Sequence, residues 1–577
     1  MAIPRLRRSP SELAERLSDE VDLYHRTYST LLRSSGETLL RVLEPSHRAM
    51  ESSLHAGAAS DELDLGAFLY ALNRLPSDVW CARLVAMGQE GSAFERAGLG
   101  RLDDWETVEA PARRRRWHRD GDGMLAVLIA SASDLDDLIP TLVAYQIEWN
   151  KLHQRVGAIE LTDEDVRPAW CAQSLGGTDE DWERIADAWD GDLRAFLDEV
   201  GARELDLRIR MLGGSEVGYG RVTRRWWEPV LGCLREQGLL DRRLYLVSSN
   251  THSLVNLVTG TAREHEDAIV AWIEEHGPRY LRTELVKLRE GRTKGSWDNF
   301  LYFCARLFFE AHPESGPTWD DRRARERELG VTHIPSSTAV RVSAQIIDPA
   351  RWDPEALDPR LADVDGSRLR DTDAVIVNID YPLGVGAYNI LREIGESTDT
   401  LAGVYVLGKA ATLNADVGDV MISNVIHDEH SGSTYWLDNA FSFDDIQPFL
   451  LFGSGLDNQR AVTVKSTFLQ NRQYLDFYYR EAFTVVEMEA GPFCNAVYEI
   501  ADLDRYPMGE AVNFAKLPID FGVIHYASDT PYTQARTLGA RGLSYFGMDS
   551  TYASSLAILR RILALEGAIH RSDARTA

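Results

Sequence analysis

The sequence predicts a mainly α-helical N-terminal region followed by an α/β domain. Apolar residues recur at helical spacing through residues 10–310, whereas short apolar runs alternate with helical patterns after about residue 340. At 577 residues the chain is too long for one hydrophobic core, and its composition, 44% hydrophobic and 26% charged, is typical of a globular protein. We therefore expect a mostly helical domain of open role over residues 1–330 and an α/β domain over residues 331–577.

The helical pattern of the N-terminal region begins at Ser9-Pro10-Ser11-Glu12, where a serine cap precedes an acid in the first turn. Residues 264–290 are amphipathic in the same way. One interruption, residues 243–250, has the pattern of a short buried strand, and a helix follows from Ser253. The polar residues 248–253 either cap that helix, which we favour, or bind a ligand. One apolar helix face is formed by Leu135, Leu138, Ile139, Leu142, Tyr145, Gln146 and Trp149.

A connection over residues 311–340 separates the two regions, because it combines proline, glycine and a dense run of charges. After it, short apolar runs of strand length alternate with helical patterns, which indicates a largely buried sheet covered by helices. The predicted strands are Ala374–Ile379, Gly403–Leu407, Val417–Ser423, Ala461–Lys465, Thr484–Met488 and Gly522–Tyr526.

Charge and cysteine usage exclude several functional classes. The net charge of −28 argues against nucleic acid as a partner, since non-specific binding to nucleic acid requires a basic surface. The five cysteines are scattered and form no Cys-x-x-Cys, so neither disulfides nor a zinc site is expected, and no other metal is predicted. We find no signal peptide and no apolar run long enough to span a membrane, and we expect a cytoplasmic protein without a membrane partner.

Four motifs in the second region combine into a pattern that suits a sugar and a base. The first, residues 380–389, is a strand end, then a turn containing Gly384 and Gly386, then a helix start, where backbone amides can approach a ligand. The second, residues 407–420, follows a buried strand with small residues around Gly408 and Lys409. A ligand or another part of the chain can therefore pack closely against that backbone.

The third motif is Met488-Glu489 at the end of a predicted strand, and the fourth is Ser528-Asp529 at the end of another. A carboxylate at a strand end can accept two hydrogen bonds from a vicinal diol. A second carboxyl group can protonate a leaving group if its pKa is raised by burial. The pair therefore points to cleavage of an N-glycosidic bond.

In this order, the motifs resemble those of the nucleoside phosphorylase/nucleosidase superfamily, especially its methylthioadenosine/adenosylhomocysteine nucleosidase and AMP nucleosidase branch. The resemblance covers about residues 371–565. Residues 384–389 (Gly-Val-Gly-Ala-Tyr-Asn) are similar to Gly-Ile-Gly-Lys-Val-Asn of that branch, and residues 486–489 match its Val-Glu-Met-Glu. Ser528-Asp529 is similar to its catalytic Ser-Asp. The resemblance implies a three-layer, mixed-sheet, phosphorylase-like domain and a homo-oligomer without a cofactor.

The resemblance also implies a role for each matched residue. Glu489 would hold the ribose hydroxyls, Met488 would pack on the sugar, and Phe468 would contact the base. Asp529 would donate a proton to the purine. Gly384, Gly386, Gly408, Lys409 and Ser528 would complete the binding site.

Two departures concern the nucleophile. Val406 and Lys409 stand where phosphorylases of the hexameric type carry an arginine and a serine or threonine for phosphate, which favours water. Lys409 could still contact a phosphate co-substrate or could be a plain surface lysine. Hydrolytic relatives have a glutamate that activates water, and Asp380 is a weak candidate for it.

The preferred function is hydrolytic cleavage of a purine nucleoside or nucleotide. The alternatives are a phosphorolytic nucleoside phosphorylase and a relative that senses nucleosides or acts as a scaffold without turnover. Asp529 has a competing use as a cap for a helix beginning at Thr530-Pro531. The basic run 113–119 is interpreted as a solvated face or as a partner for carboxylates rather than as a site for nucleic acid.

Overall fold

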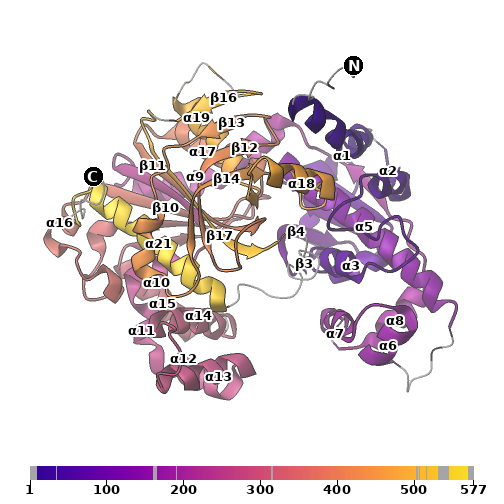
Figure 1. Ribbon diagram of the computed structural model, residues 1–577, viewed down its shortest axis with the longest axis horizontal. Helices are drawn as coiled ribbons and strands as arrows, with labels where there is room; N and C mark the ends of the chain where they lie inside the picture. The colour runs from indigo at the N-terminus through magenta and orange to yellow at the C-terminus, as the bar shows by residue number, and fades with distance from the viewer. Residues whose placement is uncertain are drawn as a thin grey trace, which may run out of the picture.

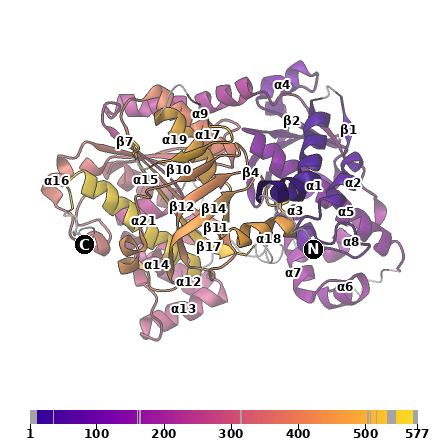
Figure 2. The same cartoon turned by 45° about the horizontal axis from the view of Figure 1, so that its top comes forward.

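The structure, a computed structural model, describes residues 10–33, 36–159, 161, 166–189, 191–312, 316–501, 505, 507–514, 516–530 and 545–569. Within these residues the strands form two sheets, one of six strands and one of eleven. Figures 1 and 2 show the N-terminal elements α1–α8 on one side of the molecule and the large sheet on the other.

The six-stranded sheet lies in the N-terminal region and has the order β1-β6-β2-β5-β4-β3. β2 runs parallel to β5 and β6, and the other neighbours are antiparallel. Apolar side chains of α3, α5 and α8 cover one face of this sheet. The strands are β1 (Thr38–Leu39), β2 (Leu84–Gly88), β3 (Glu106–Ala110), β4 (Arg113–Arg119), β5 (Met124–Leu128) and β6 (Arg208–Met211). The helices are α1 (Pro10–Leu32), α2 (Glu44–Ala49), α3 (Leu65–Leu72), α4 (Gly91–Arg96), α5 (Ala132–Val156), α6 (Pro168–Leu175), α7 (Asp179–Ala188) and α8 (Leu193–Ala202).

This six-stranded sheet was not expected among the helices of the N-terminal region. β2 and β5 are five-residue apolar runs, and runs of that length do not distinguish a strand from a buried helix segment. β4 lacks a pattern of alternating apolar residues because it carries successive arginines, some of which pair with acids on α5. The expected apolar helix face within 135–149 is confirmed as part of α5.

The eleven-stranded sheet is mixed, with the order β16-β13-β12-β14-β15-β11-β7-β10-β9-β8 and with β17 paired to β11 and β12. Its strands are β7 (Arg243–Ser249), β8 (Val331–Ile334), β9 (Ala344–Ile347), β10 (Ala374–Asp380), β11 (Leu401–Thr412), β12 (Val420–Asp428), β13 (Thr434–Trp436), β14 (Gly455–Thr463), β15 (Val485–Glu487), β16 (Ala511–Asn513) and β17 (Asp520–Asp529). β11, β15, β14, β12 and β17 pair in a closed ring.

Strand β7 precedes the boundary that we expected near residue 330, yet it belongs to the large sheet. It was correctly predicted as a strand, and it lies between β10 and β11, parallel to both. The large sheet therefore takes one of its inner strands from the N-terminal region. The side chain of Asn250, just after β7, accepts hydrogen bonds from the amides of His252 and Ser253, which supports the capping interpretation.

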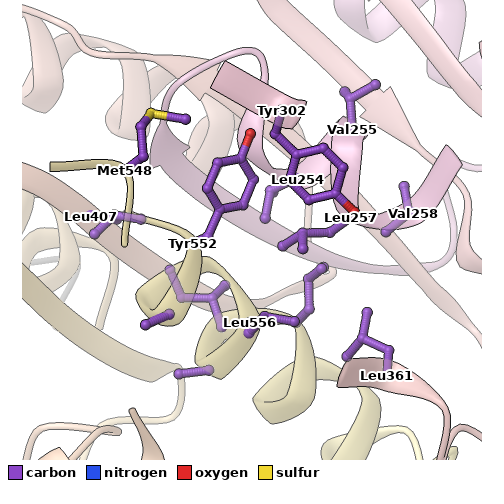
Figure 3. Close-up of a cluster of buried hydrophobic side chains, with 14 of the residues drawn as sticks. Leu254, Val255, Leu257, Val258, Tyr302, Leu361, Leu407, Met548, Tyr552 and Leu556 are labelled. Carbon is purple, nitrogen blue, oxygen red and sulfur yellow. The ribbon is translucent and has the colours of Figure 1, made fainter. Parts of the chain in front are cut away.

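Helices cover both faces of the large sheet, so this part of the molecule has three layers, as Figure 2 shows. Alternate residues of β7 enter different cores: Leu244 and Leu246 pack with α9, α17 and α19, and Tyr245 and Val247 pack with α10, α14 and α21. In Figure 3 the side chains of α21 face those of α10 and α14. The helices of this part are α9 (Glu216–Glu236), α10 (Ser253–Thr259), α11 (Thr261–Glu264), α12 (Glu266–His276), α13 (Arg279–Arg289), α14 (Trp297–Glu310), α15 (Pro317–Glu328), α16 (Gly366–Arg370), α17 (Val385–Ser397), α18 (Arg472–Arg480), α19 (Ala490–Ala501) and α21 (Tyr545–Leu565).

The α/β character and the mixed sheet expected for the second region are confirmed. None of the described helices has both the length and the apolar character needed to cross a membrane.

Candidate active site

A cavity of about 350 Å³ lies where the N-terminal sheet meets the ends of strands in the large sheet. This volume is within the usual range for small-molecule sites, roughly 300–1,000 Å³. The wall contributed by the N-terminal region includes Tyr70, Arg74, Arg113, Arg114, Arg115, Ser131, Asp134 and Thr223. The wall contributed by the rest of the chain includes Arg341, Tyr381, Gly386, Gly408, Lys409, Thr467, Gln470, Glu487, Met488, Glu489, Ser528 and Asp529.

Strand register brings the two predicted carboxylates to one cavity. Ala411 of β11 is opposite Val486 of β15 and also opposite Asp529 of β17. Because β15 is antiparallel to β11, the chain that comes after it, including Glu489, turns back toward Lys409. Glu489 and Asp529, forty residues apart in sequence, therefore both line the cavity.

The turn that carries Glu489 is held by the neighbouring carboxylate. Glu487 accepts hydrogen bonds from the backbone amides of Glu489 at 2.6 Å and Ala490 at 2.7 Å, and from the hydroxyl of Thr463. These bonds satisfy amides at the start of α19 and fix the position of the turn. Burial and the charge of Glu487 raise the pKa of Glu489, whereas Arg113 and Lys409 act to lower it.

Asp529 carries a buried carboxyl group whose pKa lies above its usual value. Its side chain is 3% exposed, and burial raises its pKa from 3.8 to about 6, against the opposing effects of Ser528, Lys409 and Arg74. The Ser528 hydroxyl lies 3.1 Å from Oδ1 of Asp529 and 3.3 Å from the carbonyl of Ala410, and can donate to either. Oδ2 has no hydrogen-bond partner among the described residues. It is therefore available to a ligand.

Two of the arginines on the N-terminal wall are bound to acids of α5. Arg113 contacts Asp137 through two nitrogens at 3.0 and 2.8 Å, and Arg115 bridges Asp137 and Asp134 at 2.8 and 2.9 Å. Burial alone would raise the pKa of Asp137, but these arginines hold it below its usual value. The interpretation of the basic run as a partner for carboxylates is thus confirmed for these residues. Its place on the cavity wall was missed.

Seven of the nine predicted site residues line the cavity: Gly386, Gly408, Lys409, Met488, Glu489, Ser528 and Asp529. Phe468 does not. It is 1% exposed and packs edge-on against Tyr70 at 5.2 Å between ring centroids, so it supports the wall from behind. An aromatic residue after a strand is equally compatible with a hydrophobic core and with a base-binding site. The sequence pattern alone therefore could not show that Phe468 packs in the core and does not line the cavity.

Gly384 also lies outside the cavity wall. Its φ of 51° is in the left-handed region, and a Cβ there would collide with the side chain of Ser133 at the start of α5. The hydroxyl of Ser133 accepts a hydrogen bond at 2.9 Å from the amide of Val385, the first residue of α17. Gly384 therefore has a packing role, in which it lets two helix starts approach each other.

Asp380, the weak candidate for activating water, is not on the cavity wall either. Its carboxylate pairs with Arg114, which also donates to the carbonyl of Tyr381 at 2.8 Å.

Among the wall residues that the sequence analysis did not place in the site, the arginines of 113–115 could have been recognised as candidates. A concentrated basic run in an acidic chain is a recognisable signal for anion binding. Arg74 has no comparable signal, since it comes after a helix as an isolated basic residue.

Comparison with known proteins assigns the chain to a family. A family of unknown function (DUF6909) matches residues 40–564, so the chain belongs to that family. The match includes both walls of the cavity and every strand of the two sheets except β1. No curated protein matches the sequence.

Several solved structures are similar to part of the chain. A methylthioadenosine/adenosylhomocysteine nucleosidase from Colwellia psychrerythraea, in complex with adenine, is 13% identical over 42% of this chain and 90% of its own, with a TM-score of 0.29. The corresponding nucleosidase from S. pneumoniae is 14% identical over 41% and 92%, with a TM-score of 0.28. A uridine phosphorylase from Vibrio fischeri is 10% identical over 42% and 88%, with a TM-score of 0.27. Similarities at these scores do not determine the chemistry of the cavity, which depends on the cavity's own residues.

Proposed function

We propose that the protein cleaves the N-glycosidic bond of a purine nucleoside or nucleotide and that water accepts the ribosyl group. The observation that carries this proposal is that Glu489 and Asp529 line one cavity, where Asp529 presents an unpartnered oxygen on a buried carboxyl group. A glycosidase needs one group that holds the sugar and another that protonates the leaving group, and this pair supplies both.

In the proposed reaction, Glu489 accepts hydrogen bonds from the 2′ and 3′ hydroxyls of the ribose, and Met488 packs against the sugar. Asp529 transfers its proton to N7 of the purine. The electron pair of the bond between C1′ and N9 moves to the base, and the sugar develops oxocarbenium character. Water then forms the new bond at C1′ and loses a proton to solvent. A positioned acid of this kind contributes about 10²- to 10⁴-fold to the rate.

The pKa of Asp529, about 6, suits this role. The best general acid has a pKa near the working pH, because it must hold its proton before the reaction and release it during the reaction. At pH 7 an acid with this pKa is protonated in roughly a tenth of molecules, and at pH 5 in about nine tenths. The proposal therefore requires an activity that rises as the pH falls toward 6.

A second candidate function is phosphorolysis, in which inorganic phosphate replaces water as the nucleophile. The specific observation in its favour is the cationic character of the cavity, where desolvation and the charges of Arg113 and Arg74 lower the pKa of Lys409. A phosphate ion would be attracted to such a wall.

The test is to incubate the full chain with a panel of purine nucleosides and their 5′-monophosphates, with and without inorganic phosphate. Free base without phosphate supports hydrolysis. Base that appears only with phosphate, together with ribose 1-phosphate, supports the second candidate. Asp529→Asn should lose turnover and Glu489→Gln should weaken it, whereas Asp371→Asn and Glu355→Gln, exposed acids outside the cavity, should retain it in full. Full turnover by both site variants would refute the assigned roles, and binding of a purine nucleoside without cleavage would favour a sensor.

A further inference from the structure

The cations of the cavity wall differ in whether acids already neutralise them. Arg113 and Arg115 are bound to acids of α5, and Arg114 is bound to Asp380. Arg74, Lys409 and Arg341 line the same cavity, and none of the three forms an ion pair with a residue that the structure describes. Of these, Arg74 and Lys409 are the two whose charges act on Asp529, so they are the ones with charge left for a ligand beside that group.

Arg74 is the more unusual of the two, because its side chain is only 5% exposed. The guanidinium lies 3.4 Å from the centre of the Tyr70 ring, and Nη1 donates to the Tyr70 carbonyl at 3.1 Å. Nε has no hydrogen-bond partner among the described residues. Asp137 is near enough to act on its charge, but that carboxylate already accepts bonds from Arg113 and Arg115. A buried guanidinium without its own carboxylate is costly, and an anionic ligand would offset the cost.

Lys409 completes the arrangement from the opposite wall. It lies on β11 between Gly408 and Ala410, which are buried, while its own side chain is exposed to the cavity. Desolvation by the cavity walls and the charges of Arg113 and Arg74 lower its pKa, against the opposing charges of Asp529 and Glu489. The lowering effects prevail, so the surroundings of Lys409 are cationic on balance, and an added anion would stabilise them.

We propose that Arg74 and Lys409, with Arg113 behind them, form an oxyanion subsite that binds a phosphate group in the cavity. Guanidinium and ammonium groups bind phosphate through charge-assisted hydrogen bonds, and the free Nε of Arg74 and the three donors of Lys409 supply them. The group is either the 5′-phosphate of a nucleotide or free phosphate. The identity of its carrier rests on the proposed function, whereas phosphate binding itself does not.

The subsite also explains why one cavity is built from two sheets. The pair that would act on the sugar and the base, Glu489 and Asp529, comes entirely from the large sheet. Arg74 and Arg113 come from the N-terminal region and act on the charges of these same groups. The N-terminal region would thus select substrates that carry phosphate, while the large sheet would supply the chemistry.

The first experiment measures binding to the full chain by calorimetry at pH 7, with inorganic phosphate and adenosine 5′-monophosphate as probes. We expect at least one to bind and its affinity to fall as salt is added. Lys409→Met and Arg74→Gln should each weaken binding by about 10- to 100-fold, the usual range for a lost hydrogen bond to a charged group. Lys409→Arg should retain most of the affinity. Arg282→Gln, an exposed arginine on α13, serves as the matched control.

Because Arg74 is buried, its substitution could unfold the protein, so Lys409→Met, at an accessible position, carries the test independently. Absence of binding by both probes would overturn the proposal, as would wild-type affinity in folded Lys409→Met. The carrier is identified by the panel assay. Cleavage of 5′-monophosphates in strong preference to nucleosides identifies a nucleotide, and phosphate-dependent cleavage of nucleosides identifies free phosphate. Phosphate binding without any cleavage would leave the subsite standing and refute only the proposed glycosidase function.

Discussion

Replacing Asp529 with asparagine should stabilise the protein while it removes turnover. Burial raises the pKa of this carboxyl group from 3.8 to about 6, so the folded state holds the proton more tightly than the unfolded state. For an acid shifted in this direction, stability is lost as the pH rises from the unfolded pKa to the folded one, and the loss is constant above it. A shift of about two units corresponds to about 3 kcal/mol at pH 7 and above, and to about 1.6 kcal/mol at pH 5. Asparagine carries no charge and avoids this cost.

The assay is differential scanning calorimetry of wild type and Asp529→Asn at pH 5, 6, 7 and 8. With an unfolding entropy of about 2.1 cal/mol/K per residue, 3 kcal/mol corresponds to a rise in Tm of about 2–3 °C if the chain unfolds as one unit. The rise should grow from pH 5 to pH 7 and then level off, while kcat falls about 10²- to 10⁴-fold. Asp371→Asn, an exposed position, should show neither effect. A Tm difference that does not depend on pH, or full turnover by Asp529→Asn, would refute the reasoning.

Three further predictions concern the walls of the cavity. Glu489→Gln should weaken cleavage of ribonucleosides by about 10- to 100-fold through loss of one of the carboxyl oxygens that bind the diol, and wild type and variant should differ less on a 2′-deoxy substrate in steady-state assays. Asp137→Asn should destabilise the protein by about 3–5 kcal/mol, because it leaves the buried Arg115 and the half-buried Arg113 without their shared carboxylate; chemical denaturation measures this, and a loss under 1 kcal/mol would contradict it. Gly384→Ala should lower Tm through a strained φ and a collision with Ser133, and unchanged stability would show that α5 can move aside.

The parts of the site that the sequence predicted are those encoded locally. Glu489 comes two residues after β15 and Asp529 is the last residue of β17, and each follows an apolar run that the sequence shows, which predicts a polar residue near a strand end. Gly408 and Lys409 also follow a predicted apolar run, residues 403–407, although β11 continues past them to Thr412. What the sequence could not give is the register that pairs Ala411 with both Val486 and Asp529 and so brings the two carboxylates to one cavity, because pairing between distant strands leaves no local signal.

The parts that were missed depend on contacts between the two regions. Arg74 is an ordinary residue at a helix end until the fold places it across from Lys409. Phe468 has the same local pattern whether it contacts a base or a neighbouring tyrosine, and only the packing against Tyr70 decides. Formation of a homo-oligomer stays a prediction, and so does the cytoplasmic location.

Strand β7 decides which fragments of the chain can fold, and this leads to a final prediction. A fragment that begins at residue 331 matches the boundary expected from the sequence but lacks β7, so β10 and β11 would each lose a parallel partner. Their amides and carbonyls would be exposed as sheet edges, and both cores would lose β7 side chains that are at most 2% exposed. We expect residues 331–577 to aggregate, whereas a fragment that begins at residue 212 and retains α9 and β7 should be more soluble and show more strand content by circular dichroism. Cooperative unfolding of the shorter fragment would show that the large sheet does not need β7. If only the longer fragment folds, it should still fail to bind phosphate, since Arg74 and Arg113 lie outside it.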